Sequence, residues 1–404
     1  MIEKIINEKN KNTIKAITNI CNRCLSKNLK VNFNNILYCE ECYNYKRINE
    51  TMYLERKPRK RQKKNHKLVL PFELSQTQLI GEKFINSCYI SKTKGFLHAV
   101  CGAGKTEMCL KTIFQALQNY DSICFVIPRV EIIKQVYLRF IEYFPKTKIF
   151  ALYKNQGFNE TADIYLSTPQ QLIRFYNEFD LVIVDEIDAY PFANNAFLQR
   201  LIKKARKHTS ALIYISATIN KQYKKLIKNK KIKYLLIPKR YHNYDLVIPE
   251  FKKYKSLYDL KVIDFLKISL LRKQRLMIFF PSIYLMKKFS YHLDNHKIKS
   301  VYISSKSEYK KRIIKKYTNS EYKLLLTTTL LERGITFSNI NVFVFEADHR
   351  IFTKAVLTQI AGRVGRDKLY PGGKLLFFSK FKTQAMVDCK QELKRLNKVK
   401  NNAM

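Results

Sequence analysis

The chain has 404 residues, enough for two to three domains of ordinary size, and 46% of them are apolar, which excludes a disordered chain. No apolar run approaches the roughly 18 residues that a membrane span needs. Lysine and arginine number 76 against 32 acidic residues, giving a net charge of +44. This excess favours a polyanion such as nucleic acid, or an anionic membrane surface, although a general bias toward lysine would also produce it.

The first region, residues 1–55, contains two cysteine pairs. Its opening sequence MIEKIINEKNKN lacks the apolar core of a signal peptide, so we expect a cytosolic protein, in which nine cysteines would not form disulfides. Cys21 and Cys24 form one CxxC turn, Cys39 and Cys42 form another, and 14 residues separate the pairs. Such turns direct four thiolates to a structural Zn²⁺, and a pair of redox dithiols is the alternative. The pattern leaves open whether this zinc-binding module binds DNA or a partner protein.

A basic run follows, with eight basic residues among the twelve of RKPRKRQKKNHK. Such a run cannot bury itself, which is typical of a solvated linker, and we place this linker at residues 56–70. The alternative is an arm that contacts phosphates, because counterion release rewards any cluster of this kind.

The rest of the chain alternates short apolar runs with longer amphipathic ones. Strands that are apolar on both faces, alternating with helices, predict parallel sheets covered by helices. The pattern pauses at 238–270 and then restarts. We therefore predict an α/β fold with a first lobe at 71–237, a connector at 238–270 and a second lobe at 271–404.

A phosphate-binding loop is indicated by AVCGAGKTEM, which lies between an apolar strand and a helix. Gly102 and Gly104, on either side of Ala103, allow close approach of the backbone to phosphates. Lys105 would reach the β- and γ-phosphates, and Thr106 would hold Mg²⁺. These residues predict an ATP site in the first lobe.

Three carboxylates end the apolar strand in DLVIVDEIDAY. Adjacent acids at the end of a buried strand are costly unless a cation compensates them. We expect Asp185 to hold Mg²⁺ and Glu186 to activate the attacking water. Asp188 is placed to couple this site to Ser216 and Thr218 in the turn after the next strand.

The second lobe carries QIAGRVGR, which begins at Gln359. Phosphoryl transfer needs positive charge where the γ-phosphate develops negative charge, and Arg363 and Arg366 would supply it. They can do so only if the two lobes meet, which predicts a cleft that closes over one nucleotide.

In this order, these motifs resemble the superfamily 2 helicases over residues 72–395, which implies two RecA-like lobes. The resemblance implies that Gln78, in LSQTQ, reads the adenine and that Gln359 contributes to nucleotide binding. It also implies contacts to the phosphates and sugars of a nucleic-acid strand, which provide affinity but no sequence specificity. The residues implied for these contacts are Pro128, Arg129, Thr168, Pro169, Ser282, Thr328 and Thr329.

The segments DEIDAYPF and ERGITF are similar to those of the ComFA-type late-competence proteins, which drive transforming DNA into the cell and carry an N-terminal four-cysteine zinc site. RNA helicases of the DEAD-box type instead have DEAD and HRxGRxGR at these places. The ComFA resemblance implies ATP, Mg²⁺ and Zn²⁺ as cofactors and single-stranded DNA as substrate. It also implies a phosphoribosyltransferase-like competence partner, a membrane DNA-uptake channel and a location at the inner face of the cell membrane.

Two other functions remain open from the sequence. One is a DNA repair or replication-restart helicase, and the other is a zinc-dependent DNA-binding scaffold with weak ATPase activity. We interpret His98 as a packing residue. The other five cysteines are expected to be small core residues, and they are Cys88, Cys101, Cys109, Cys124 and Cys389.

Overall fold

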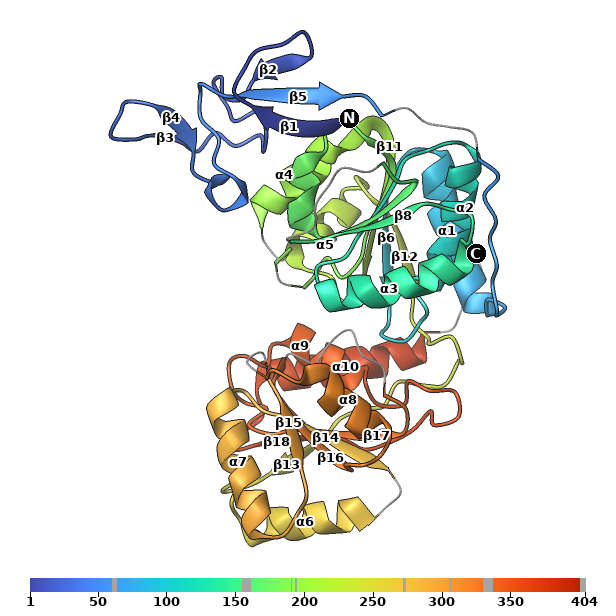
Figure 1. Cartoon of the computed structure of the whole chain (residues 1–404). Helices are drawn as coiled ribbons and strands as arrows, with labels where there is room; N and C mark the ends of the chain where they lie inside the picture. Colours follow the sequence, from blue (N-terminus) through green and yellow to red (C-terminus); the bar gives the residue numbers. More distant parts are fainter. Residues whose placement is uncertain are drawn as a thin grey trace. The chain divides into compact units, whose positions relative to one another are not determined.

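The computed structural model describes residues 1–59, 64–154, 161–189, 191–192, 195–271, 274–304, 307–329 and 337–399. The chain divides into two compact units (Figure 1). The first contains residues 1–98 and 105–236, and the second contains residues 237–404 together with the short segment 99–104. Each is built on a parallel sheet, which confirms the predicted α/β class with two lobes.

The sheet of the first lobe has seven strands in the order β12-β6-β11-β10-β7-β9-β8. From β6 to β8 every neighbouring pair is parallel. The central strands β7, β9 and β10 are buried along their whole length, as strands covered by helices on both faces must be. The strands are β6 (Lys94–Ala99), β7 (Ile123–Val126), β8 (Ile149–Leu152), β9 (Ile164–Ser167), β10 (Phe179–Val184), β11 (Arg206–Ser216) and β12 (Lys233–Ile237).

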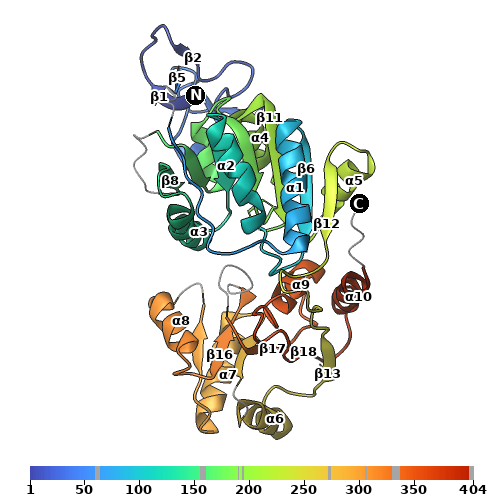
Figure 2. The same ribbon diagram turned by 90° about the vertical axis from the view of Figure 1, so that its right-hand side faces the viewer.

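Helices cover this sheet. Helix α1 packs against α2 and β11, and α3 packs against β8 and β9 (Figure 2). Helix α4 packs against β11 and η3. The helical elements are α1 (Gln76–Ile90), η2 (Glu107–Cys109), α2 (Leu110–Gln118), α3 (Val130–Tyr143), η3 (Pro169–Arg174), α4 (Ala196–Ala205) and α5 (Lys221–Lys228), with η denoting a 3₁₀ helix. Most of the predicted site residues follow strands of this lobe.

The N-terminal module has a three-stranded antiparallel sheet, β1-β5-β2, and a hairpin, β3-β4, that points away from it in Figure 1. Its strands are β1 (Ile2–Ile6), β2 (Thr13–Lys15), β3 (Leu29–Val31), β4 (Leu37–Cys39) and β5 (Tyr53–Lys57), with a 3₁₀ turn η1 (Tyr43–Tyr45). Ile17, Ile48 and Leu54 of this module share one hydrophobic cluster with Phe175 and Leu201 of the first lobe. The module and the lobe therefore have a common core.

The basic run after this module is partly ordered by ion pairs. Its first two residues belong to β5. The Arg59 side chain is buried beside Glu178, with 3.6 Å between charged atoms, and Lys64 lies 2.9 Å from Asp163. These contacts attach both ends of the run to the first lobe.

The second lobe has a six-stranded parallel sheet in the order β13-β18-β17-β14-β16-β15. Its strands are β13 (Glu250–Lys253), β14 (Arg275–Phe279), β15 (Val301–Ile303), β16 (Leu324–Thr327), β17 (Ile340–Val344) and β18 (Leu375–Ser379). Its helices are α6 (Leu260–Leu271), α7 (Ile283–Asn295), α8 (Lys310–Thr318), α9 (Lys354–Ala361) and α10 (Gln384–Lys398).

Aromatic side chains dominate the core of the second lobe. Phe289 on α7 packs edge-on against Phe345, with ring centroids 5.2 Å apart, and lies 5.4 Å from the ring of Phe280. Such rings bury large apolar areas and prefer inclined contacts. Among the described residues, those that form this core or pack against it all lie from Tyr254 onward. Of the five scattered cysteines, four are buried and Cys101 is partly exposed.

Candidate nucleotide and metal sites

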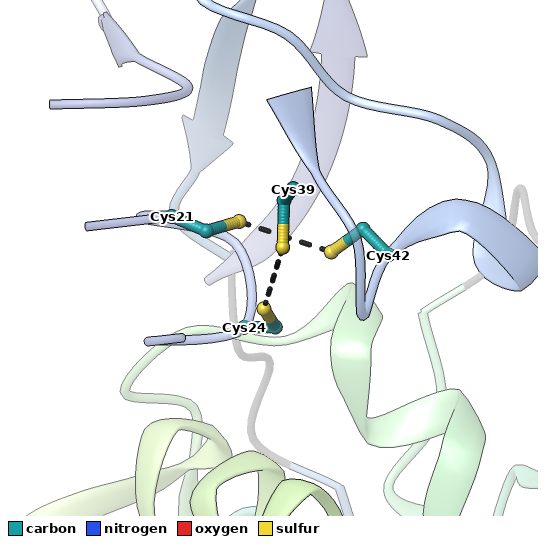
Figure 3. A group of neighbouring side chains, drawn as sticks. All are labelled: Cys21, Cys24, Cys39 and Cys42. Atoms are coloured by element: carbon teal, nitrogen blue, oxygen red, sulfur yellow. Dashed lines mark hydrogen bonds between the residues drawn. The ribbon is translucent and has the colours of Figure 1, made fainter. Parts of the chain in front are cut away.

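The four paired cysteines come together in the N-terminal module (Figure 3). Their sulfur atoms all lie within 4.8 Å of one another, with 3.8 Å between Cys21 and Cys42 and 3.5 Å between Cys24 and Cys39. A tetrahedron with Zn–S bonds of about 2.3 Å has sulfurs roughly 3.8 Å apart. The donor set and spacing therefore fit a structural zinc ion.

The local backbone conformation positions the four cysteine side chains. The first CxxC turn closes through the Leu25 N–H, which donates to the Cys21 carbonyl at 2.7 Å, while Leu25 takes a positive φ of 59°. Cys39 ends β4 and Cys42 precedes η1, so the second pair spans the exit from a strand into a helical turn. All four thiols are buried. Burying four thiolates without a cation would be costly, so this arrangement favours a bound metal.

The phosphate loop follows β6, as predicted. Gly102 and Gly104 have φ values of 82° and 75°, a region that side chains other than glycine rarely adopt. The two glycines are thus required by the backbone itself. Thr106 precedes the 3₁₀ turn η2, and the α2 helix begins only at Leu110. Lys105 and Thr106 lie where the loop passes into helical structure, which is the position that binds phosphates.

The acidic motif follows β10. The Asp185 N–H donates to the Val126 carbonyl at 2.9 Å, and the Asp185 carboxylate accepts the Glu186 N–H at 2.8 Å. Burial, reinforced by the charge of Glu186, raises the pKa of Asp185 to about 6, while Lys105 acts in the opposite direction. A divalent cation would relieve this cost. The arrangement therefore fits Asp185 as the Mg²⁺ ligand, with Lys105 close by.

Asp188 contacts both residues to which the sequence assigned it. Its carboxylate accepts the Ser216 hydroxyl at 2.5 Å and the Thr218 hydroxyl at 2.7 Å. Ser216 is the last residue of β11, so these bonds join the ends of two neighbouring strands. The His98 ring lies 3.1 Å from the Ala217 carbonyl and 3.0 Å from the Tyr234 hydroxyl, which are structural contacts.

The predicted strand-contacting residues of the first lobe lie at one edge of its sheet. Pro128 and Arg129 follow β7, and Thr168 and Pro169 follow β9, its parallel neighbour. Carboxyl ends of parallel strands share an edge, which is where ligands bind open α/β sheets. Thr168 is buried and precedes η3, which begins at Pro169.

In the second lobe the corresponding residues follow β14 and β16, which are also parallel neighbours. Ser282 is exposed, and its hydroxyl accepts the Leu285 N–H at 3.2 Å, so it caps α7. Thr328 and Thr329 directly follow β16 and are partly exposed. Of ERGITF only Phe337 lies among the described residues, and Tyr190 of DEIDAYPF also falls outside them.

The glycine–arginine motif lies at the end of α9. Gln359 and Arg363 are buried and Arg366 is partly exposed. Gly365 has a φ of 64°, and a Cβ there would lie 2.1 Å from the Pro371 carbonyl oxygen, so no other residue fits. This motif thus requires glycine at position 365.

Sequence reasoning missed Arg240, a fully buried residue of the connector. Its guanidinium donates to the Gly365 carbonyl, and desolvation lowers its pKa to about 10. His242 lies 3.2 Å from the same carbonyl oxygen. A single arginine in a polar connector carries no pattern that distinguishes it from a solvated one.

The predicted adenine reader, Gln78, lies in the first turn of α1. Its side-chain carbonyl accepts the Ser75 N–H at 2.9 Å, and its own N–H donates to the Ser75 hydroxyl at 3.4 Å. This reciprocal pair is a capping box, which fixes the start of the helix. Adenine recognition by Gln78 stays a prediction.

Comparison with known proteins identifies the family. A model described as "Type III restriction enzyme, res subunit" matches residues 70–221, and one described as "Helicase conserved C-terminal domain" matches residues 252–368. The competence protein ComFA of Bacillus subtilis is 30% identical over 376 residues, covering 90% of this chain and 81% of that protein. ComFA of Streptococcus pneumoniae is 31% identical over 398 residues, covering 94% and 90% respectively. The chain belongs to the ComFA family.

Solved structures agree on the fold of this ComFA-family chain. Saccharomyces cerevisiae Dbp5, bound to RNA and ADP BeF3, aligns with a TM-score of 0.57 at 16% identity, over 80% of this chain and 92% of that one. RecG bound to a three-way DNA junction also aligns with a TM-score of 0.57, at 21% identity, over 83% of this chain and 46% of that one. Both support two RecA-like lobes.

The two helicase domains and the ComFA relatives make this ComFA-family chain a DNA-dependent ATPase of the helicase type. The domains imply ATP with Mg²⁺ as the nucleotide cofactor. In the part of the chain that the structure describes, no helix has the length and apolar character needed to cross a bilayer.

Proposed function

We propose that this ComFA-family ATPase translocates along single-stranded DNA and powers the uptake of transforming DNA during competence. The observation that carries the proposal is the shared sheet edge of the first lobe. There Asp185, the proposed Mg²⁺ ligand, follows β10, while Arg129 follows the adjacent strand β7 and Thr168 follows β9, which pairs with β7. One edge of the sheet thus carries residues proposed for nucleotide chemistry and residues proposed to contact the strand.

The proposed cycle uses the residues of both lobes. Lys105 and Thr106 bind the phosphates and Mg²⁺, Glu186 activates water, and Arg363 and Arg366 stabilise charge on the γ-phosphate when the lobes close. Bound Mg·ATP supplies the phosphoanhydride whose hydrolysis drives the cycle. As the lobes alternately close and open, first one lobe and then the other would bind the DNA backbone tightly, which would move the protein along the strand.

Family membership supports the competence role, because the two ComFA relatives carry that name. On the same support we propose a phosphoribosyltransferase-like competence protein and the membrane DNA-uptake channel as partners, and a location at the inner face of the membrane. We further propose that the four-cysteine cluster holds zinc, which its sulfur spacing supports.

The decisive experiment measures ATP turnover with single-stranded DNA, with RNA and without nucleic acid, at one salt concentration, because affinity for phosphates depends strongly on salt. We expect stimulation by single-stranded DNA above that by RNA. A Lys105→Ala variant, which should not bind nucleotide, serves as the background. Turnover that is indifferent to DNA would contradict the proposal.

A strand-displacement assay separates translocation from the alternative of a repair or replication-restart helicase. A pure translocase need not separate the strands of a duplex. Efficient unwinding of forked or junction substrates would favour the repair alternative. DNA binding that survives in residues 1–67, with no ATPase activity in the full chain, would favour a scaffold.

A further inference from the structure

Lys204, near the end of α4, is a buried lysine that the nucleotide chemistry does not use. Its side chain has no exposed surface, and its ammonium group makes three hydrogen bonds. The acceptors are the Glu3 carboxylate at 2.7 Å, the Arg23 carbonyl at 2.7 Å and the Ile173 carbonyl at 2.8 Å. An ammonium has three donors, so all three are satisfied.

The three acceptors belong to three segments that are distant in sequence. Glu3 lies on β1 of the zinc-binding module. Arg23 lies inside the first CxxC turn, between the ligands Cys21 and Cys24. Ile173 lies in η3, the turn that begins with the proposed strand-contacting residue Pro169. Lys204 therefore joins the metal site to the segment that we assign to DNA contact.

Arg56 strengthens the same junction from the opposite side. Its guanidinium donates to Glu3 at 3.0 Å and to the Asn22 carbonyl at 3.2 Å, and it stacks 3.4 Å above the ring of Tyr176. Two successive carbonyls of the CxxC turn, those of Asn22 and Arg23, thus accept hydrogen bonds from cations: partly buried Arg56 and fully buried Lys204. Burial makes the Lys204 bonds in particular strong and their loss costly.

The chain after η3 is held on both sides as well. Ile2 of β1 forms an antiparallel bridge with Phe175. The Asn177 N–H donates to the carbonyl of Lys204 itself at 2.8 Å. The segment 169–178 therefore has contacts with the zinc-binding module along one side and with the end of α4 along the other.

From this geometry we propose that metal binding at the four cysteines positions the Thr168–Pro169 segment through Lys204, so that zinc sets the affinity of the first lobe for DNA. This inference rests on the function proposed above. When Cys21 and Cys24 both bind one ion, the turn between them directs the Arg23 carbonyl toward Lys204. Without the ion the turn loosens and the ammonium loses one of its three acceptors. Lys204 is a positioning residue, and the zinc-binding module need not touch DNA itself.

Hydrogen exchange on the full-length protein tests the coupling without DNA. We expect amides of residues 169–178 to exchange faster in metal-stripped protein than in zinc-loaded protein. Peptides from α7 and α10 in the second lobe should be unchanged. Equal exchange of residues 169–178 in the two samples would overturn the proposal, whatever the ATPase assay shows.

Two perturbations, applied singly and together, test whether the metal and Lys204 act on DNA affinity through the same connection. The perturbations are zinc removal and Lys204→Met, and the readout is the Kd for a fluorescent oligothymidine. We expect either perturbation alone to weaken binding roughly tenfold, and both together to weaken it no further, because they break one connection. Lys204→Met should keep one zinc per chain and its basal ATP turnover without DNA.

Two further variants make the result decisive. Lys203→Met removes an exposed lysine from the same helix and should bind DNA like the wild type. Lys204→Arg keeps the positive charge near Glu3, but its planar fork cannot reproduce three divergent bonds. It should weaken binding in the same way even if Lys204→Met folds poorly. If zinc removal weakened DNA binding equally in wild type and in the Lys204 variants, the metal would act by another route and the proposal would be wrong.

Discussion

The zinc-binding module and the second lobe differ in where their hydrophobic cores lie. The module shares its core with the first lobe, and the buried pair of Lys204 and Glu3 adds a polar junction. The second lobe has a separate aromatic core around Phe289. The difference indicates two mechanical parts rather than three, because a module without its own core cannot move as an independent domain.

The largest effect should come from loss of the metal. Cys39→Ser removes one ligand, and structural zinc sites contribute strongly to folding. We expect the melting temperature of the first unit to fall by more than about 10 °C, since that unit would lose at least several kcal/mol. Differential scanning calorimetry, together with zinc release to a coloured chelator, measures both quantities.

Cys101→Ser is the matched control for this change, because Cys101 is not part of the sulfur cluster. It should keep one zinc per chain and a normal melting profile. If Cys39→Ser lost its zinc while the first unit melted unchanged, the shared core would not depend on the metal.

A change in the core of the second lobe should destabilise that lobe and leave the first unit and its zinc unaffected. Phe289→Ala removes a buried ring and should cost about 3–5 kcal/mol of unfolding free energy in the second lobe. The exposed Tyr291 on the same helix provides the control, and Tyr291→Ala should have little effect. Chemical denaturation measures the unfolding free energy of the second lobe, and a separate assay measures the zinc content of the folded variant. Loss of zinc in Phe289→Ala would show that the two units are not independent.

Glu186→Gln should affect chemistry without affecting either core. The amide cannot accept the proton of the attacking water, so ATP should still bind but turn over about 10²–10³-fold more slowly. Nucleotide binding by fluorescence and single-turnover hydrolysis measure the two properties. Normal turnover would mean that Glu186 does not activate the water.

The smallest effect should come from the aromatic contact between the module and the first lobe. Tyr45 stacks on Phe197 with ring centroids 5.3 Å apart, and Tyr45→Leu should destabilise the first unit by about 1 kcal/mol. The comparison is Tyr43→Leu, because Tyr43 instead contacts Arg47 inside the module. Thermal unfolding of the two zinc-loaded variants gives their melting temperatures. Equal melting temperatures would mean that the stacked pair of Tyr45 and Phe197 does not contribute to stability.

The sequence is most informative about features that depend on residues close together along the chain. The CxxC turns, the glycines of the phosphate loop and the acids after β10 each combine a local backbone shape with a required chemistry. Gly102 and Gly104 illustrate this, because their positive φ angles exclude other residues. The alternation of apolar runs likewise predicted the two parallel sheets, since strands buried on both faces are built mostly of apolar residues.

Other features exist only in the folded chain. Lys204 meets Glu3, Arg23 and Ile173 because the module packs against α4, and nothing near Lys204 in the sequence distinguishes it from the exposed Lys203. Arg240 is similar, since its partner at Gly365 lies 125 residues away. A chain with 76 basic residues offers no local signal for the few that are buried.

By itself, the sequence predicted the chemistry of this protein: a phosphate loop, an acidic strand end, paired arginines and four thiols spaced for a metal ion. Each is a short segment whose conformation and reactivity are set by its own residues. Only the tertiary structure decided that the four thiols belong to the first lobe's core and that a buried ammonium links them to η3. Such links depend on charges that become strong only after burial, which is a property of the packed fold and not of any one segment.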